Sequence, residues 1–436
     1  MELHGTSTIN TQNHLEIGGV DTVTLAKEYG TPLYIYDVAA IRQHARGFKE
    51  TFEKAKVSAQ VAYASKAFSS IAMYELINEE GLSLDVVSAG ELYTAVKAGF
   101  PAERIHFHGN NKTEAELRYA IDQNVGCYVI DNFHEIELLN RLAKELGTKV
   151  VALLRVTPGV GAHTHEFITT GQDDSKFGFG LTNGQTEEAI QRVLATDTIT
   201  LKGVHCHIGS QIFEMDGFIA AADRIIDQMV IWNEKYNYKT EVLNLGGGFG
   251  IHYTDEDQPL EPETYVANII TEVQAKISAN QLAMPEIWIE PGRSLVGEAG
   301  TTLYTVGSSK DVPDVRRYVA VDGGMGDNIR PALYDAKYSA VLANKMADQA
   351  DTTVSIAGKY CESGDMLIWD IPLPNPQPND LLAIFSTGAY SYSMASNYNR
   401  VPRAAVVFVE HGEHQLVVKR ETFEDIIQND LHLTKR

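Results

Sequence analysis

Val61-Ala-Tyr-Ala-Ser-Lys66 is a short apolar run that ends on a single lysine and passes into a helical pattern after Ala67. A lysine at the carboxyl end of a buried strand is poorly solvated, so its amine loses a proton more easily and becomes available as a nucleophile. A surface lysine at the start of a helix would give the same local pattern. The rest of the chain decides between these two interpretations.

Short apolar runs of this kind alternate with amphipathic stretches from Asp37 to about Gly300. Eight can be counted: Val61–Ser65, Leu84–Ser88, Ile105–Gly109, Cys127–Asp131, Val150–Val156, Gly203–His207, Val242–Gly246 and Ile287–Glu290. Strands that alternate with helices predict βαβ units and a parallel sheet, and eight of them over roughly 250 residues is typical of a (β/α)₈ barrel, TIM-like in architecture. A doubly wound parallel sheet also fits this alternation.

The pattern changes after the barrel. β-rich segments separated by turns follow, the clearest being Tyr318–Val321, Thr353–Ile356, Leu381–Phe385, Ala404–Val409 and Gln415–Val418. We therefore predict three parts: an N-terminal segment 1–36, a barrel 37–300 and an all-β C-terminal domain 301–436. The N-terminal segment contains a helical stretch, Val23–Tyr29, and a strand, Thr31–Tyr36. The proline cluster in Ile371–Asp380 predicts a rigid loop.

Composition excludes several classes of partner. The 436-residue chain has 58 acidic and 36 basic residues, a net charge of -22, which disfavours nucleic acid and anionic lipid surfaces. Cys127, Cys206 and Cys361 are widely spaced and predict neither a disulfide framework nor a structural zinc site. No apolar run reaches about 18 residues, and the N-terminus lacks the features of a signal peptide. We expect a cytoplasmic protein without a membrane partner.

Residue types that carry chemistry follow the predicted strands, where barrel enzymes place their catalytic groups. The first strand ends at Lys66, the sixth at His205-Cys-His207-Ile-Gly-Ser210, the seventh at Gly246-Gly-Gly248 and the eighth at Glu290-Pro-Gly-Arg293. Three consecutive glycines allow backbone N–H groups to surround an anion, which predicts a phosphate site, although a tight turn would also use glycine. Neither a dinucleotide-binding nor a nucleoside triphosphate motif is present.

A metal-dependent barrel hydrolase is the rival interpretation. His205 and His207 share one face of a strand, as two zinc ligands would, and His106 and His108 repeat that spacing. Such a hydrolase needs neither a phosphate-binding glycine run nor a buried lysine, so we expect no metal site. A non-catalytic cofactor-binding protein is the third alternative.

A lysine for an imine, glycines for a phosphate, a histidine to stack and a carboxylate on the last strand together describe a pyridoxal phosphate site. The ordered motifs resemble those of the diaminopimelate decarboxylase family. They are Tyr63-Ala-Ser-Lys66, Ser175-Lys-Phe-Gly178, His207-Ile-Gly-Ser210, Gly246-Gly-Gly248, Glu290-Pro-Gly-Arg293, Asp322-Gly-Gly-Met325, Arg330-Pro-Ala-Leu-Tyr334, Cys361-Glu-Ser-Gly-Asp365 and Tyr390. They run through nearly the whole chain. Phe68-Ser69-Ser70 departs from the family, which usually has asparagines there.

The resemblance implies a (β/α)₈ barrel followed by a β-domain to which the N-terminal segment adds a strand. Lys66 would hold pyridoxal 5'-phosphate as an imine, His207 would face its ring, and Glu290 would favour protonation of the pyridine nitrogen. A racemase of similar fold has arginine in place of this carboxylate, so Glu290 favours decarboxylation. The other implied cofactor-binding residues are Ser210, Gly246, Gly247, Gly248, Pro291, Gly292, Arg293 and Tyr390.

The implied reaction is the decarboxylation of meso-2,6-diaminopimelate to L-lysine and CO₂, the last step of lysine biosynthesis. The implied substrate-binding residues are Arg293, Arg330 and Tyr334 for the distal carboxylate, Glu362 for the distal ammonium, and Tyr390. Cys361 resembles the family's proton donor, so the catalytic set is Lys66, His207, Glu290 and Cys361. A homodimer with shared active sites is also implied. Substrates of the ornithine, arginine or carboxynorspermidine type remain open. A long irregular stretch, Thr157–Thr182, is interpreted as a lid.

Overall fold

The structure is a computed structural model that describes residues 3–160 and 174–434. The chain divides into two compact units, which we call the barrel unit (residues 43–251 and 258–295) and the β-rich unit (residues 1–42, 252–257 and 296–436). The predicted domain boundaries lie near these divisions. The difference is that residues 252–257, within the predicted barrel, belong to the β-rich unit. Much of the predicted lid lies outside the described residues.

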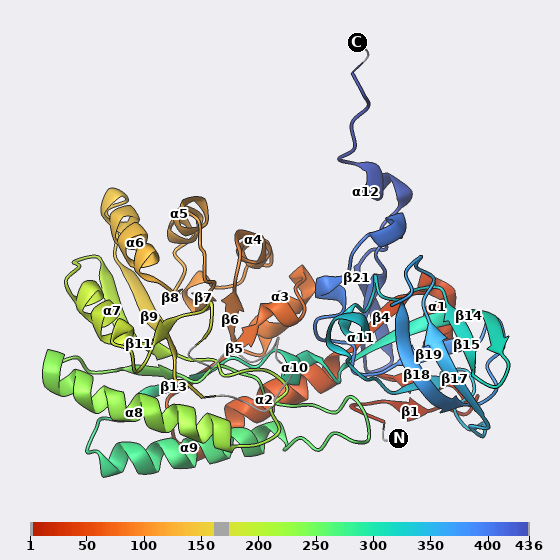
Figure 1. Ribbon diagram of the computed structural model, residues 1–436, viewed down its shortest axis with the longest axis horizontal. Coiled ribbons are helices and arrows are strands. Elements are labelled where there is room, and N and C mark those ends of the chain that lie inside the picture. Colours follow the sequence, from red (N-terminus) through yellow and green to blue (C-terminus); the bar gives the residue numbers. More distant parts are fainter. Residues whose placement is uncertain (1–2, 161–173, 435–436) are drawn as a thin grey trace. The chain divides into compact units, whose positions relative to one another are not determined.

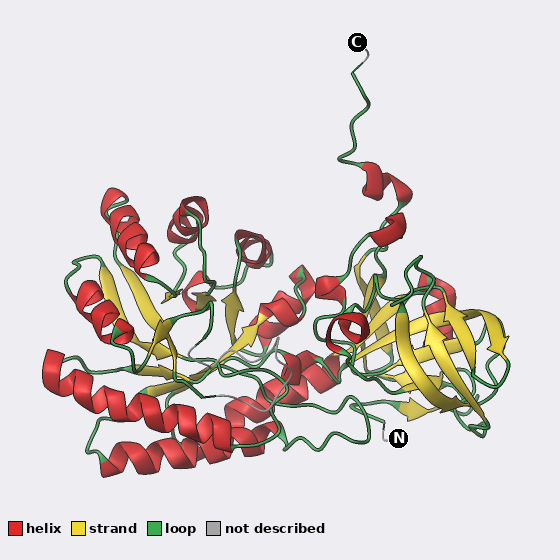
Figure 2. Cartoon of the chain, in the orientation of Figure 1, coloured by secondary structure: helices red, strands yellow, loops and turns green. Residues whose placement is uncertain are grey.

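The barrel unit contains all eight predicted runs as parallel strands (Figures 1 and 2). They are Ala59–Ala64 (β5), Ser83–Val86 (β6), Ile105–Phe107 (β7), Cys127–Ile130 (β8), Val150–Thr157 (β9), Ile199–His205 (β11), Val242–Asn244 (β12) and Glu286–Ile289 (β13). β13 pairs with β5 and β8 pairs with β9, so the sheet closes on itself. The (β/α)₈ prediction is therefore confirmed, and the doubly wound alternative is wrong. A short strand, Phe179–Gly180 (β10), adds to β9.

Helices cover the outside of the barrel, which explains why its strands are apolar on both faces. Several begin at a residue whose side chain caps the helix, because a serine, threonine or asparagine oxygen accepts a free backbone N–H: Ser70, Ser88, Thr113 and Asn132 do so. The helices are Val38–Ala55 (α2), Ile71–Glu79 (α3), Ala89–Lys97 (α4), Glu114–Asp122 (α5), Phe133–Glu145 (α6), Gln185–Leu194 (α7), Asp216–Tyr236 (α8), Pro262–Ala279 (α9) and Arg293–Val296 (α10).

The β-rich unit is built on a sheet with the order β18-β17-β15-β14-β4-β20-β21, where β19 also pairs with β14, and β16 with β19. Its strands are Leu33–Asp37 (β4), Gly300–Val312 (β14), Arg316–Val321 (β15), Ala340–Leu342 (β16), Thr352–Ala357 (β17), Met366–Leu373 (β18), Leu381–Ile384 (β19), Ala405–Glu410 (β20) and Glu413–Val418 (β21). β4 lies between β14 and β20, so the N-terminal segment is part of this sheet. Short elements complete the unit: Thr8–Ile9 (β1), Leu15–Ile17 (β2), Val20–Asp21 (β3), Thr22–Tyr29 (α1), Arg330–Tyr334 (α11) and Phe423–Ile427 (α12).

The proline cluster is not entirely a loop. β18 extends to Leu373 and includes Pro372, which the sequence prediction placed in the rigid loop. β18 is an edge strand that pairs only with β17 among the described residues, so the missing N–H of Pro372 can face away from its neighbour. Within residues 3–160 and 174–434, no helix is long and apolar enough to cross a membrane.

Candidate active site

Lys66 follows β5 directly, in a single 3₁₀ turn, Ser65–Ala67. Its backbone neighbours are buried, and Ala64 N–H donates to Pro291 O (3.1 Å), which joins this strand end to that of β13. The Lys66 side chain itself is exposed. The prediction that burial of the strand end makes this amine poorly solvated is therefore wrong, because Lys66 lies in the 3₁₀ turn after the packed strand and is exposed there. The lysine is accessible to a ligand.

The departure at Phe68-Ser69-Ser70 has a local structural role. Phe68 is buried, and its N–H donates to Tyr63 Oη (3.1 Å). Ser69 Oγ donates to Ser65 O (2.9 Å), and Ser70 Oγ caps α3 by accepting the N–H of Met73 (3.1 Å). These contacts hold the turn that carries Lys66.

Glu290 is the most heavily paired group of the site. It is buried at the end of β13, where its Oε1 lies 2.9 Å from His108 Nε2 and its Oε2 2.9 Å from His205 Nε2. Asn244 Nδ2 also donates to Oε1, at 2.6 Å. Burial alone would raise the pKa of Glu290, but His108 and His205 outweigh it and hold the pKa well below its usual range. The carboxylate is therefore ionised at neutral pH.

Asp85, on β6, has the opposite behaviour. Burial raises its pKa to about 7, against the opposing effect of His108. Glu290 raises this pKa further, and Lys66 lowers it. Asp85 and Glu290 are thus two buried carboxyl groups near His108 whose pKa values are shifted in opposite directions. Glu290 is ionised, and Asp85 is readily protonated.

His207 and the three glycines form a second part of the site. Burial, followed by the charges of Lys66 and Arg155, holds the pKa of His207 well below its usual range, so the ring is neutral. Gly247 N–H donates to its Nδ1 at 3.4 Å. Gly246 has φ +68°, and a side chain at Gly247 would overlap the carbonyl oxygen of Glu290. The glycines are thus required by close backbone packing, and Gly246 N–H donates to Asn244 Oδ1 at 2.9 Å.

Arg293 contacts Ser210 across the barrel unit. Its Nε and Nη2 donate to Ser210 Oγ at 3.2 and 3.0 Å, and the arginine is buried. Since Ser210 Oγ accepts these bonds, its own hydroxyl proton remains for another acceptor. Gly292 lies just before Arg293, and a side chain there would approach Ala64 Cβ, at the end of β5, at 3.0 Å.

Residues predicted for the substrate lie in the β-rich unit, except Arg293. Arg330 is buried, donates to Tyr338 Oη (2.7 Å) and lies over the rings of Tyr253 and Tyr334, at 4.9 and 5.9 Å. Tyr390 has φ +63°, a conformation that needs support from its surroundings in a residue other than glycine.

Cys361 and Glu362 are both exposed. They lie in a turn whose backbone is held by the buried side chain of Asp365. Asp365 is buried, and its carboxylate accepts the N–H groups of Met325 and Tyr360 (2.6 and 2.8 Å). Cys361 N–H donates to Asn399 Oδ1 at 2.8 Å. Cys361 and Glu362, which are predicted to act on the substrate, are therefore exposed side chains on a turn with a hydrogen-bonded backbone.

Each histidine pair contributes one member to a cluster with metal-ligand spacing, and the predicted pair His205 and His207 does not occur together in it. Among the described residues, the barrel cluster with metal-ligand spacing is His108, His205 and Glu290, without His207. His106 stacks on Trp288 instead, with ring centroids 4.2 Å apart and planes 8° apart. Sequence reasoning thus identified Glu290 and missed its hydrogen-bond partner Asn244 and the nearby carboxyl group of Asp85. The available signal was a polar residue near the carboxyl end of an otherwise apolar barrel strand.

Arg155 and Phe177 account for part of the Ser175–Gly178 motif. The Arg155 guanidinium lies 4.2 Å from the centroid of the Phe177 ring, and its Nε is 3.9 Å from Asp131 Oδ1. A side chain at Gly178, which has φ +73°, would approach Arg155 O at 2.8 Å. This motif therefore packs on β9 and positions a partly buried cation, whose charge acts on His207.

Comparisons with known proteins extend over both units. The model of the pyridoxal binding domain of pyridoxal-dependent decarboxylases matches residues 38–297. Diaminopimelate decarboxylase from Bacillus subtilis is 65% identical, with 99% of this chain and 98% of the relative covered. The Staphylococcus aureus enzyme is 48% identical, with 97% and 98% covered. The solved structure of the M. jannaschii enzyme with L-lysine has a TM-score of 0.92 and 36% identity, and 98% of each chain is covered.

Proposed function

The chain belongs to the diaminopimelate decarboxylase family, and we propose how its residues carry out the pyridoxal phosphate-dependent conversion of meso-2,6-diaminopimelate to L-lysine and CO₂. The observation that carries the proposal is Glu290, a buried carboxylate kept ionised by His108 and His205 at 2.9 Å each. Such a group is suited to a protonated ring nitrogen, which is the feature that favours decarboxylation.

The residues present fit pyridoxal phosphate. The donor set offers an accessible lysine, an ionised carboxylate, a neutral imidazole and a closely packed glycine run. When bound, the cofactor supplies an electron sink for the electron pair left as CO₂ departs. Lys66 would bind it covalently, and His207 would lie against its ring. The ornithine- and arginine-type alternatives are not favoured, because the curated relatives are diaminopimelate decarboxylases over their full length.

Phosphate binding is assigned to the ends of β12 and β13, and β13 pairs with β5, the strand that leads to Lys66. Gly246, Gly247, Gly248 and Gly292 are all assigned to this site. Gly248 and Gly292 would donate their backbone N–H groups, while those of Gly246 and Gly247 donate to Asn244 Oδ1 (2.9 Å) and His207 Nδ1 (3.4 Å) and hold the loop in place. Ser210 would donate its hydroxyl proton, since Arg293 already donates to its oxygen. Pro291 lacks an N–H, and its carbonyl holds the end of β5 in place.

Substrate recognition is assigned by charge. Arg330 and Arg293 would bind the distal carboxylate with help from Tyr334, and Glu362 would bind the distal ammonium, since a zwitterionic end needs both charges. Cys361 would deliver a proton to the carbon that has lost its carboxylate, and Tyr390 would contact cofactor and substrate. The rigid turn around Asp365 supports this assignment, because it keeps Cys361 and Glu362 exposed together.

We further propose a cytoplasmic homodimer whose sites are shared between chains, with domains divided near the boundaries predicted from the sequence except that residues 252–257 belong to the β-rich unit. The free thiols of Cys127, Cys206 and Cys361 support a reducing compartment. The exposed turn at Cys361 supports a role for this residue in a site beyond its own β-rich unit.

A covalent labelling experiment tests the function. The purified chain, loaded with pyridoxal phosphate, is reduced with borohydride and digested, and the modified peptide is identified by mass spectrometry. We expect the label on Lys66, CO₂ and L-lysine from meso-2,6-diaminopimelate, and loss of all three in Lys66→Ala. Lys97→Ala, at an exposed lysine on α4, is the matched control. A label elsewhere, or unchanged turnover in Lys66→Ala, would overturn the assignment.

A further inference from the structure

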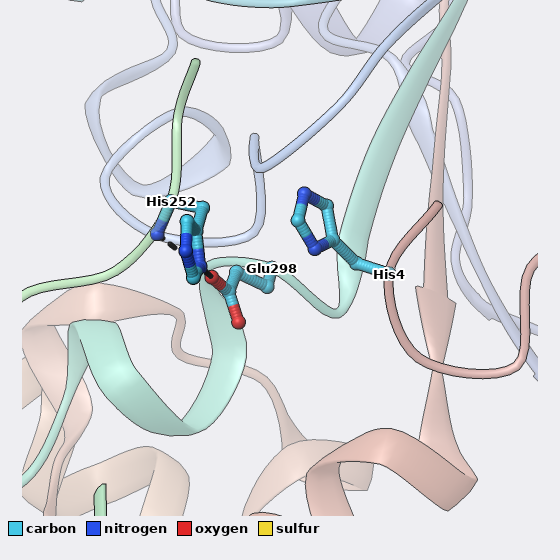
Figure 3. A group of neighbouring side chains, drawn as sticks. All are labelled: His4, His252 and Glu298. Atoms are coloured by element: carbon cyan, nitrogen blue, oxygen red, sulfur yellow. Dashed lines mark hydrogen bonds and ion pairs between the residues drawn. The ribbon is translucent and has the colours of Figure 1, made fainter. Parts of the chain in front are cut away.

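A second group of metal-ligating side chains lies in the β-rich unit and includes none of the residues assigned to the decarboxylase site. It consists of His4, His252 and Glu298, which point toward one another in Figure 3. One ring nitrogen of each histidine and one carboxylate oxygen of Glu298 all lie within 4.8 Å of one another. His252 Nδ1 is 3.0 Å from Glu298 Oε1, and the two imidazole rings are stacked, with centroids 5.7 Å apart.

The three residues come from distant parts of the sequence, and the fold holds each of them. Thr6 anchors the N-terminal segment, because its N–H and hydroxyl both donate to Asp37 Oδ2 at 2.7 Å. Asp37 N–H in turn donates to Ala299 O at 2.9 Å, next to Glu298. Leu3 packs against the hydrophobic core of the unit. His4 is therefore fixed on both sides along the chain and held near Glu298.

His252 is held by its backbone as well as by its ring. Its N–H donates to Glu298 Oε1 (2.7 Å), and its carbonyl accepts the Ser386 hydroxyl (2.8 Å). Ser386 follows β19, which pairs with β14 just beyond Glu298. The imidazole and the carboxylate thus belong to one hydrogen-bonded framework, and their relative position does not depend on a ligand.

Several atoms of the cluster that could bind a metal have no partner within residues 3–160 and 174–434. Neither ring nitrogen of His4 has a hydrogen-bond partner there, and Glu298 is bonded only to His252. The side chains of His252 and Glu298 are 41% and 19% exposed, so an ion can reach them from solvent. A structural role alone would leave the His4 ring without a polar contact.

We propose that His4, His252 and Glu298 bind one divalent transition-metal ion of the zinc class, with water in the fourth position. Two imidazoles and one carboxylate are a known zinc ligand set, and bonds of about 2.0–2.2 Å would place the ligand atoms roughly 3.3 Å apart in a tetrahedron. The present spacing requires only a small inward movement of side chains. The ion takes the place of the proton between His252 Nδ1 and Glu298 Oε1. The ring takes up a proton at Nε2 as it loses the one at Nδ1, so the imidazole binds as a neutral ligand and no net proton is released.

Zinc uptake by variants tests the site without reference to catalysis. The full-length, cofactor-loaded protein is dialysed against a chelator, then against buffer containing Zn²⁺, and metal per chain is measured by mass spectrometry. We compare wild type with His4→Gln and Glu298→Gln, the latter keeping an oxygen that can accept the His252 N–H. His134→Gln, at an exposed histidine on α6, is the matched control.

We expect wild type and His134→Gln to hold about one more Zn²⁺ per chain than His4→Gln or Glu298→Gln. Zinc should also raise the thermal midpoint of wild type and leave that of His4→Gln unchanged, because an ion that binds only the folded chain stabilises it. Zinc bound at His108, His205 and Glu290 would appear equally in all four proteins and cancel in the comparison. Equal uptake in wild type and His4→Gln would overturn the proposal.

Discussion

His205 Nε2 lies 2.9 Å from Glu290 Oε2, and both side chains are buried in the barrel unit. Burial lowers the pKa of His205, although Glu290 opposes this effect, so the ring is neutral and donates its Nε2 proton to the carboxylate. A neutral donor stabilises the anion without forming a full ion pair. The carboxylate at the end of β13 therefore stays charged and fixed in direction, which is what its proposed role requires.

The charge of Glu290 is the first feature to test. Glu290→Gln keeps the size of the side chain and removes its charge, so we expect kcat for CO₂ release to fall by roughly 10² to 10³-fold, the range for loss of a preorganised electrostatic contact. Bound cofactor should remain, because the phosphate and lysine contacts are intact. Glu286→Gln, at the start of the same strand, is the control and should retain wild-type kcat. Wild-type turnover in Glu290→Gln would remove this carboxylate from the mechanism.

His205 is predicted to act through Glu290, as a positioning residue. His205→Phe removes a hydrogen bond to a charged group, worth about 1.5–3 kcal/mol, so the pKa of Glu290 should rise by roughly one to two pH units. The acid limb of the kcat profile should then move to higher pH, since a higher pH is needed to ionise the carboxylate. His205→Gln keeps an N–H donor and should reduce this displacement. Superimposable profiles for wild type and His205→Phe, at matched thermal midpoints, would contradict the role.

Gly247 tests the predicted phosphate site. In Gly247→Ala the new methyl group would overlap Glu290 O, so the loop must move, at a cost of about 1–3 kcal/mol. We expect the dissociation constant of pyridoxal phosphate to rise roughly 5- to 150-fold, measured by titration of cofactor-free protein. Gly90→Ala is the control, because a methyl group there has no atom closer than 3.7 Å. Unchanged cofactor affinity in Gly247→Ala would exclude this loop from the phosphate site.

The barrel was predictable because each of its strands is short and apolar on both faces, which a parallel sheet covered by helices requires. β14 was not predicted, although it is the central strand of the β-rich sheet. Its first half is buried, whereas the polar residues from Ser308 to Asp311 are exposed. No single alternation of apolar and polar residues therefore runs along the strand. Residues 252–257 were also misplaced, because the link from β12 to α9 joins another unit without a change in composition.

The sequence identified candidate site residues, but it did not predict how exposed they are or which side chains they contact. The strand-end positions of Lys66, His207 and Glu290 follow from the barrel pattern. The exposure of Lys66 does not follow, because it depends on a 3₁₀ turn that the run Ser65–Ala67 gives no local signal for. The pairing of Glu290 with His108 and His205 also depends on barrel closure, which brings residues far apart in sequence to one interior layer.

Asp327, in the β-rich unit, predicts a pH dependence of stability. It is buried, and burial raises its pKa to about 7, although the Gly324 N–H at 2.9 Å opposes this. An unfolded aspartate has a pKa near 3.9, so the folded chain keeps a proton that the unfolded chain releases. This stabilising contribution is complete below about pH 4 and is lost as the pH rises through about 7.

Asp327→Asn should therefore gain stability relative to wild type between about pH 5 and pH 8, by up to about 3 kcal/mol, because the amide carries no charge to bury at the higher pH. Thermal midpoints of both proteins across this range measure the effect. Asp335→Asn, at an exposed aspartate that follows α11, should show a constant difference from wild type. A difference for Asp327→Asn that stays constant or falls with pH would contradict the raised pKa.

Subunit mixing tests whether sites are shared between chains. Lys66 belongs to the barrel unit and Cys361 to the β-rich unit, so one lesion can be placed in each. Lys66→Ala and Cys361→Ala chains, each inactive alone, are unfolded and refolded together in equal amounts. If each site combines the barrel unit of one chain with Cys361 of its partner, half of the dimers are hybrids, and each hybrid has one site with both lesions and one with neither. Activity should return to roughly a quarter of wild type.

The control mixture combines Lys66→Ala with His207→Ala, whose lesions both lie in the barrel unit. Every site in that mixture keeps one damaged barrel whether or not sites are shared, so no activity should return. Recovery in the first mixture alone therefore requires that Cys361 serve a barrel other than its own. If neither mixture recovers, although refolded wild type does, each chain completes its own site, and the exposed turn at Cys361 must act within a single chain.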